Sequence, residues 1–347
     1  MLFFIVALLF LCLFKIKIYS PFKKNSFNDC FLDKTNTQTI NGIFVILIFL
    51  AHYSSYLKSY YPFDSITLKF IKFLGQCINC SFLFYSGFGI HEQLQKNRFS
   101  YCRKLISVRF SRLLLKFMIC VALYLIIDLI LGQRYSISTI ILSFVGFASI
   151  GNSAWYIFYM LIAYIGVYLS YRFFDKKQLS LCLFIFYLIM YTLIFYVLFP
   201  EKEAYYLTSL VFPLGMFVSL KKLAIIEILK KHNFLIISVG IIIYIASFLI
   251  RHKLQLPGPF YNITAIFFTI ILIVLTFKIK IESKILNYLG KNVFCIYILQ
   301  RLPMMTASTL ITGGVNKNNY LLIFVLSFGL TLLLSYFMNK LFKVVHL

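Results

Sequence analysis

The chain has 347 residues, of which 61% are hydrophobic and 13% are charged, and its formal net charge is +24. A soluble domain is usually about 45–50% apolar, so this composition excludes an ordinary soluble protein. Apolar runs of roughly 17–25 residues, the length that crosses a bilayer, recur along the whole chain and indicate an all-α integral membrane protein. The basic residues lie in short loops between these runs without a nucleic-acid-binding motif, so we expect the lipid bilayer, and no nucleic acid, as a partner.

The apolar runs predict about eleven membrane-spanning helices. The first, residues 2–19, lacks a basic leader and a small-residue cleavage site, so we expect an uncleaved span and not a signal peptide. The run 137–149 is short and fits an interfacial or re-entrant segment. The remaining spans are expected at 39–56, 70–90, 107–131, 154–171, 178–199, 204–220, 234–250, 259–277, 286–304 and 320–339.

Lys and Arg residues gather in alternate loops between the expected spans. The rich loops lie at 15–34, 96–104, 172–177, 221–231, 278–284 and 340–343, and the loops between them hold far fewer basic residues. Because basic loops stay on the cytoplasmic side, this alternation predicts a multi-pass protein of the cell (plasma or inner) membrane. It places the C-terminus in the cytoplasm and the N-terminus outside.

A histidine, His52, lies near the outer end of the second expected span, in the stretch NGIFVILIFLAH (41–52). At 1.5 Å per residue it lies about 20 Å from the cytoplasmic end of that helix. An ionisable residue inside a span suggests a functional site, because burying it in lipid is costly. Such a histidine stays neutral and can accept a proton. The alternative is a structural histidine bonded to a neighbouring helix. Asn41 falls within about 20° of the same helix face, so that face could line a cavity open to the cytoplasm.

A basic segment, RKLISVRFSRLLLKF (103–117), opens the fourth expected span. Arg109 and Arg112 are three residues apart on one helix face, and Lys116 continues that face. Paired guanidinium groups suit phosphate oxygens because each presents a planar fork of donors. We therefore interpret them as an anion clamp, with an ordinary cytoplasmic basic cluster as the alternative.

Other polar residues carry weaker signals. Trp155 and Asp128 lie near the outer ends of their spans and could form an acceptor vestibule. The alternatives are an interfacial belt aromatic for Trp155 and a solvated carboxylate for Asp128. Cys77 and Cys80 form a C-x-x-C without a second pair or nearby histidines, so we expect packing residues and no metal site.

Five short motifs, in the right order, resemble integral-membrane acyltransferase family 3, which includes O-acetyltransferases of bacterial surface polysaccharides. They are NGIFVILIFLAH ending at His52, FLFYSGFGI with Ser86, RFSR with Arg109 and Arg112, WYIFYMLIAY from Trp155, and LGKNVFCIYILQ with Tyr297 and Gln300. Two positions depart from the family pattern. Asn41 stands where the family has arginine, which removes a cationic contact to the donor. Gln300 stands where the family has histidine, which puts the positioning of the acceptor in doubt.

The resemblance implies a ten-helix acyltransferase core at 39–347. Residues 1–38 would then add an N-terminal transmembrane helix and a cytoplasmic loop. It also implies an O-acyltransferase that moves an acyl group, acetyl as first choice, from cytoplasmic acyl-CoA to a hydroxyl of an extracytoplasmic carbohydrate. Acetyl-CoA would be the donor substrate, and neither a permanently bound cofactor nor a metal is implied. The implied residues are His52 for catalysis, Arg109, Arg112 and Asn41 for acyl-CoA, and Trp155, Asp128, Tyr297, Gln300 and Ser86 for the acceptor or for positioning.

Two questions stay open at the level of sequence. His52 could act as general base on the acceptor hydroxyl or could form a transient acyl-imidazole. A non-catalytic transporter or flippase component for lipid-linked glycans is the rival function, because a polar cavity with a basic mouth would serve it too. The sequence does not indicate an oligomeric state.

Overall fold

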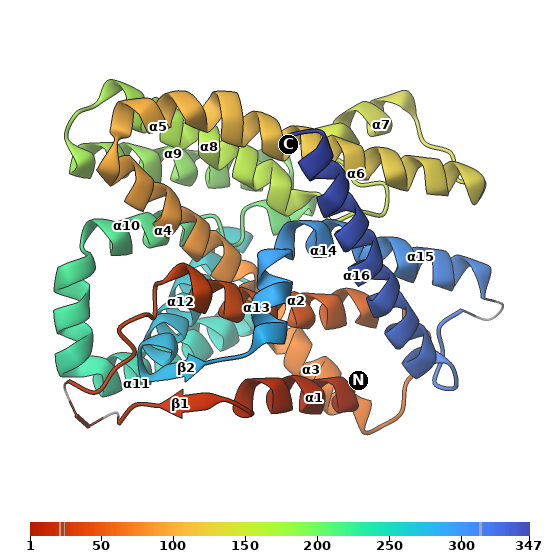
Figure 1. Ribbon diagram of the computed structural model, residues 1–347, viewed down its shortest axis with the longest axis horizontal. Coiled ribbons are helices and arrows are strands. Elements are labelled where there is room, and N and C mark those ends of the chain that lie inside the picture. Colours follow the sequence, from red (N-terminus) through yellow and green to blue (C-terminus); the bar gives the residue numbers. More distant parts are fainter. Residues whose placement is uncertain (21, 24, 312–313) are drawn as a thin grey trace.

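The computed structural model describes residues 1–347 except 21, 24 and 312–313, and the described chain is mainly helical (Figure 1). The helices are α1 Leu2–Leu13, α2 Lys34–Ser54, α3 Asp64–Leu74, α4 Cys80–Lys96, α5 Arg98–Lys104, α6 Ser111–Ile130, α7 Ile137–Phe144, α8 Trp155–Phe173, α9 Lys177–Leu198, α10 Val211–Leu220, α11 Lys222–Leu254, α12 Tyr261–Lys278, α13 Lys284–Lys291, α14 Val293–Leu299, α15 Arg301–Leu310 and α16 Tyr320–Val344. Short helical turns are the 3-10 helices Gly75–Asn79 (η1), Pro200–Tyr205 (η3) and Gly258–Phe260 (η4), and the π-helix Leu105–Phe110 (η2). The strands β1 Ile16–Ile18 and β2 Ile279–Ile281 pair antiparallel, with Ile16 opposite Ile281.

The predicted all-α membrane class is confirmed. Over the described residues, 9 helical segments are long and apolar enough to cross a membrane, and they correspond to nine of the expected spans. The expected spans 2–19 and 204–220 contain the shorter apolar helices α1 and α10. α1 ends at Leu13 because the chain then extends into β1, and α10 starts late because η3 and a turn come before it. The short run 137–149 contains α7, eight residues long.

Four expected spans have different limits in the structure. The span at 234–250 belongs to α11, which begins earlier, at Lys222 in the expected basic loop, and has non-helical backbone angles at His232. The span at 70–90 is part of one helical segment, Asp64–Lys96, in which η1 joins α3 to α4. The span at 107–131 begins earlier, at Arg98, and passes through the π-helix η2. The span at 286–304 is broken, because α13 ends at Lys291 and a new segment runs from Val293 to Leu310.

Glycines allow two pairs of helices to pack unusually closely. A Cβ atom at Gly42 of α2 would lie 1.9 Å from the Leu286 carbonyl oxygen of α13, and one at Gly290 would lie 1.7 Å from the Gln38 carbonyl oxygen. The same reciprocity joins α4 to α10. A Cβ atom at Gly87 would lie 2.0 Å from the Phe212 oxygen, and one at Gly215 would lie 2.1 Å from the Phe84 oxygen. Small residues at such crossings let backbones approach, as is common between membrane helices.

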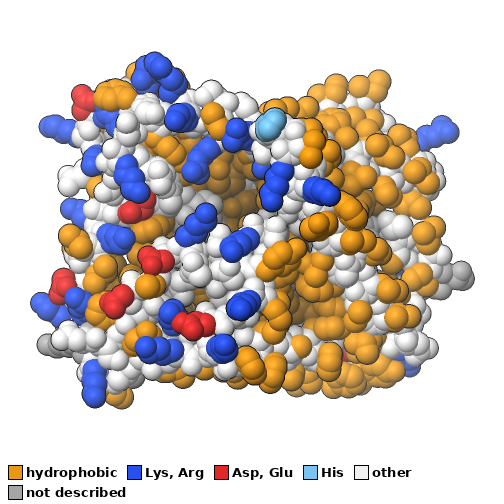
Figure 2. All heavy atoms as spheres, in the orientation of Figure 1, with side chains coloured by type: hydrophobic (Ala, Val, Ile, Leu, Met, Phe, Trp, Pro, Cys, Tyr) orange, Lys and Arg blue, Asp and Glu red, His pale blue; other side chains and the backbone are white. Residues whose placement is uncertain are grey.

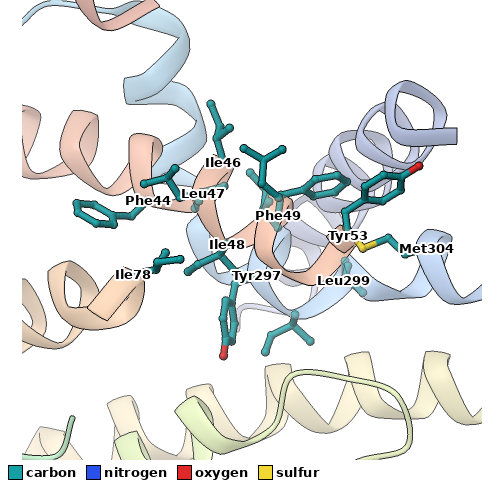
Figure 3. Close-up of a cluster of buried hydrophobic side chains, with 14 of the residues drawn as sticks. Phe44, Ile46, Leu47, Ile48, Phe49, Tyr53, Ile78, Tyr297, Leu299 and Met304 are labelled. Atoms are coloured by element: carbon teal, nitrogen blue, oxygen red, sulfur yellow. The ribbon is translucent and has the colours of Figure 1, made fainter. Parts of the chain in front are cut away.

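α2 lies in one of the two apolar cores, and Figure 3 shows how its side chains pack. Phe49 and Tyr53 point toward α16, where the Tyr53 hydroxyl donates a hydrogen bond to the Tyr320 carbonyl oxygen at 2.5 Å. Tyr297 of α14 instead points away from that cluster. α2 is therefore fixed on one side by α16, and its other side is left to face the loops and helices that form the candidate site.

Charge is distributed unevenly over the molecule. In the orientation of Figure 1, most Lys and Arg side chains gather in the left part of the view, and hydrophobic side chains dominate the right part (Figure 2). We call the left part the basic end. The short β1–β2 pair and the start of α13 lie toward this end (Figure 1). Exposed leucine, isoleucine and phenylalanine side chains on the long helices are what a bilayer would cover.

Candidate active site

His52 lies in the last turn of α2, beside the loop that precedes α8. Its Nε2 atom is 3.3 Å from the Oγ atom of Ser153, and the side chain is half-buried. The histidine ring also lies edge-on to the Tyr297 ring of α14, with the ring centroids 6.5 Å apart. His52 thus has one hydrogen-bonding neighbour and one aromatic neighbour, each from a different part of the chain.

The loop that carries Ser153 is held by its own polar groups. Gly151 has a φ of +93°, a conformation that favours glycine. The Asn152 Oδ1 atom accepts a hydrogen bond from the Ile150 N–H at 3.1 Å, and the Ser149 hydroxyl donates to the Asn152 carbonyl oxygen at 2.6 Å. The sequence analysis missed Ser153. The signal that could have found it is the turn sequence SIGNSA, directly before a span.

Two tyrosines continue the site away from His52. The rings of Tyr297 on α14 and Tyr156 on α8 are 5.4 Å apart. Both line a cavity of about 130 Å³, together with Ser86 of α4, Leu113 of α6, and the further residues Phe82, Ile157, Met160, Tyr164, Val293 and Phe294. The Tyr297 hydroxyl is buried and makes no hydrogen bond within the part of the chain that the structure describes. A bound molecule could therefore supply its partner.

Gln300 lies at the junction of α14 and α15, close to Tyr297 in the chain. Its side chain is fully buried, and its Nε2 donates to the Tyr297 carbonyl oxygen at 3.1 Å. Its Oε1 atom has no hydrogen-bond partner among the described residues. The next residue, Arg301, is half-buried and donates from Nε to the Tyr56 hydroxyl at 3.3 Å. The position where the family pattern has histidine therefore still presents a free acceptor atom.

Arg109 and Arg112 are exposed, and neither forms an ion pair with a described residue. Arg109 belongs to the π-helix η2, and its guanidinium lies 5.2 Å from the centre of the Tyr101 ring. Lys116, expected on the same face, instead lies over the Phe342 ring of α16 at 5.3 Å. π-helical turns inside α-helices are frequent at functional sites.

The arginines do not line the cavity themselves, and the link to it is Leu113, the residue after Arg112, which does. Figure 2 shows a hollow with an apolar floor, rimmed by Lys and Arg side chains, between the upper row of helices and α13. Free cationic side chains beside an apolar opening suit a ligand with an anionic head and a long thin tail.

The sequence matches the family described as acyltransferase domain over residues 39–340. The chain belongs to acyltransferase family 3. No curated protein and no solved structure gives a significant match. The family match covers every residue of the site described above, and it makes this chain a membrane acyltransferase.

The remaining predicted site residues of this family 3 protein lie around the centre. Asn41 lies on α2 toward the basic end, with its buried Oδ1 unpaired among the described residues. Trp155 packs edge-on against Tyr156, with ring centroids 6.0 Å apart. Asp128 is fully buried and accepts a hydrogen bond from the Tyr135 hydroxyl at 2.9 Å, so the solvated alternative is wrong. The structure thus joins His52, Tyr297, Tyr156 and Ser86. The roles assigned to all these residues stay predictions.

Proposed function

We propose that this membrane acyltransferase moves an acyl group, acetyl in the simplest case, from cytoplasmic acyl-CoA to a hydroxyl of an extracytoplasmic glycan or glycan precursor. The observation that supports this best is the continuity of the site. A pair of free arginines lies on the helical segment that also carries Leu113 of the apolar cavity, the cavity reaches Tyr297, and the Tyr297 ring lies edge-on to His52. Acyl-CoA has the matching shape, with phosphates at one end and a thioester at the end of a thin arm.

The donor would lie along this path. Its phosphates would bind Arg109 and Arg112, where guanidinium groups offer forked donors. Its arm would pass between Ser86, Tyr156 and Tyr297, whose free hydroxyl can donate to the thioester carbonyl oxygen. Hydrogen bonds to an oxygen that gains charge in the transition state are among the largest catalytic contributions. This orientation requires the basic end to face the cytoplasm, as the basic loops predict.

His52 would handle the proton. In the direct route, Nε2 takes the proton of the acceptor hydroxyl as its oxygen attacks the thioester carbon. The carbon–sulfur bond then breaks, and the CoA sulfur leaves and takes up a proton. In the two-step route, Nε2 itself attacks the thioester carbon, the carbon–sulfur bond breaks and the CoA sulfur leaves and takes up a proton. The acceptor oxygen then attacks the acyl carbon, the bond to Nε2 breaks, and the hydroxyl proton passes to the freed imidazole. Both routes use the nitrogen that faces Ser153, so the reacting group has to displace the Ser153 hydroxyl from Nε2. Ser153 would be a positioning residue that holds the imidazole ring until the substrate arrives and takes its place at Nε2.

The cavity argues against the rival function, a flippase for lipid-linked glycans. A flippase needs a continuous polar path, whereas the lining of this cavity is mainly aromatic and aliphatic. The direct experiment is to incubate membranes that contain the wild-type protein or His52→Ala with radiolabelled acetyl-CoA. We expect label in the glycan fraction for the wild type and a loss of at least a hundredfold for the variant. If neither sample contains labelled glycan, but the wild-type protein transports glycan and His52→Ala only weakens that transport, the result would favour the flippase.

A further inference from the structure

A second candidate site lies at the basic end, apart from the cavity that contains Tyr297. A polar groove of about 630 Å³ lies between the start of α2, the strand β2 and the helix α13. Its volume is in the range of pockets that hold small organic ligands. Among its lining residues are four lysines, namely Lys15, Lys280, Lys284 and Lys291.

The charges in this groove favour an anion. Its acidic residues are Asp33 and Glu282, and Glu282 is already paired with Lys280 at 2.5 Å. Lys15, Lys284 and Lys291 have no carboxylate partner within the described part of the chain. The groove therefore offers three free ammonium groups. Two helices also begin here, α2 at Lys34 and α13 at Lys284, and the N-terminal end of a helix attracts anions.

A buried polar side chain also faces this groove. Asn36 lines it and is only 5% exposed. Its Nδ2 donates to the Phe31 carbonyl oxygen at 2.9 Å, but its Oδ1 has no hydrogen-bond partner among the described residues. Buried polar atoms are normally paired, so this acceptor atom needs a donor. A fully ionised anionic group has no hydrogen to donate to it. The fitting ligand therefore combines an anion with a hydroxyl group.

An apolar slot continues the groove toward the bilayer. This slot, of about 380 Å³, shares Lys15, Glu282, Ser283 and Lys284 with the polar groove, and its other walls are Phe10, Leu11, Phe14 and Ile285. Phe10 and Phe14 are 64% and 69% exposed, which suits a surface covered by lipid. The slot is lined by the last turns of α1 and the first turn of α13. A ligand that fills both parts needs a polar anionic head and a hydrocarbon tail.

We propose that the groove and slot together bind one anionic phospholipid with a hydroxylated headgroup, of the phosphatidylglycerol type. Its phosphate lies between Lys15, Lys284 and Lys291, and a headgroup hydroxyl donates to Asn36 Oδ1. One acyl chain lies in the slot against Phe10 and Phe14. The lipid joins the N-terminal segment, which lies before the family match at residue 39, to α13 of the acyltransferase core. This binding does not depend on the acyl-transfer reaction.

The test measures equilibrium binding of tritiated phosphatidylglycerol to the full-length protein purified in a neutral detergent. We expect phosphatidylglycerol to bind much more tightly than phosphatidylcholine, whose headgroup carries no net charge. The double variant Lys15→Ala, Lys284→Ala should bind it roughly thirtyfold more weakly, since each lysine near an anionic lipid contributes about fivefold. The control variant Lys176→Ala, Lys177→Ala removes the same charge from the exposed start of α9, outside both grooves, and should bind like the wild type.

Asn36→Ala separates the headgroup contact from the charge. It should weaken binding of phosphatidylglycerol but leave binding of phosphatidic acid, which has no headgroup hydroxyl, nearly unchanged. A structural defect would weaken both. The proposal is overturned if phosphatidylcholine binds as tightly as phosphatidylglycerol, or if both double variants bind phosphatidylglycerol equally. It is also overturned if soluble CoA, and not phosphatidylglycerol, loses affinity in Lys15→Ala, Lys284→Ala, because the groove would then hold the donor nucleotide.

Discussion

Replacing Gly87 by alanine tests the close packing of α4 against α10. Gly87 is the residue after Ser86, which lines the cavity. The added Cβ atom would lie 2.0 Å from the Phe212 carbonyl oxygen of α10. A backbone oxygen cannot rotate away as a side chain can, so α4 and α10 must move apart. Gly89, two residues further along α4, offers the matched control, because a Cβ atom there meets nothing within 4 Å.

The magnitudes follow from two opposing effects. Alanine favours a helix over glycine by about 1 kcal/mol, and this gain applies to both substitutions. Forcing an extra carbon into a well-packed contact costs about 1–3 kcal/mol, and the 2.0 Å approach at Gly87 places the cost at the upper end. We therefore expect Gly87→Ala to destabilise the protein by about 2 kcal/mol, and Gly89→Ala to stabilise it by about 1 kcal/mol.

Thermal unfolding of both variants in the same detergent measures this difference. Gly87→Ala should unfold at a lower temperature than the wild type, and Gly89→Ala at the same or a higher temperature. Turnover should fall in Gly87→Ala as well, because Ser86 lines the cavity and moves with α4. Equal unfolding temperatures for the two variants would refute the close contact between α4 and α10.

The other predictions concern the donor site, the orientation and the loop before α8. Arg109→Ala or Arg112→Ala should raise the KM for acyl-CoA about ten- to a hundredfold, with partial rescue by lysine, which lacks the fork; an unchanged KM in steady-state assays would make them an ordinary basic cluster. In a variant freed of its native cysteines, a membrane-impermeant thiol reagent should label Arg134→Cys but not Lys104→Cys in intact cells; equal labelling would contradict the orientation. Ser153→Ala should lower kcat about two- to tenfold with the KM for acyl-CoA unchanged, because a neutral hydrogen bond to the imidazole is lost. Full activity there would remove Ser153 from the site.

The sequence predicted the parts of the fold that depend on local pattern. Long apolar runs and alternating basic loops are read within a window of about twenty residues, so the membrane class and most spans are confirmed by the structure. The expected limits of α1 were wrong for a nonlocal reason. α1 stops where β1 begins, and β1 exists because β2, far along the chain, pairs with it.

The candidate site was predictable where a motif marks it and hidden where the fold assembles it. His52, Tyr297 and Ser86 each belong to a motif, and the structure brings them to one region. Ser153 belongs to no motif that the sequence analysis used, because its importance comes from the distance to a histidine on another helix. The burial of Asp128 was missed for the same reason, since the Tyr135 loop folds back over it.

The most direct test of the account is the turnover of His52→Gln, measured with acyl-CoA and a glycan acceptor on purified protein. Glutamine can keep a hydrogen bond to Ser153 but cannot accept a proton at neutral pH, so a structural histidine would tolerate the change. We predict normal yield and near-normal acyl-CoA binding, because Arg109 and Arg112 are untouched, with turnover lowered about 10²–10⁴-fold. A His52→Gln protein that retains more than about a third of wild-type turnover would contradict the claim that His52 is the catalytic group.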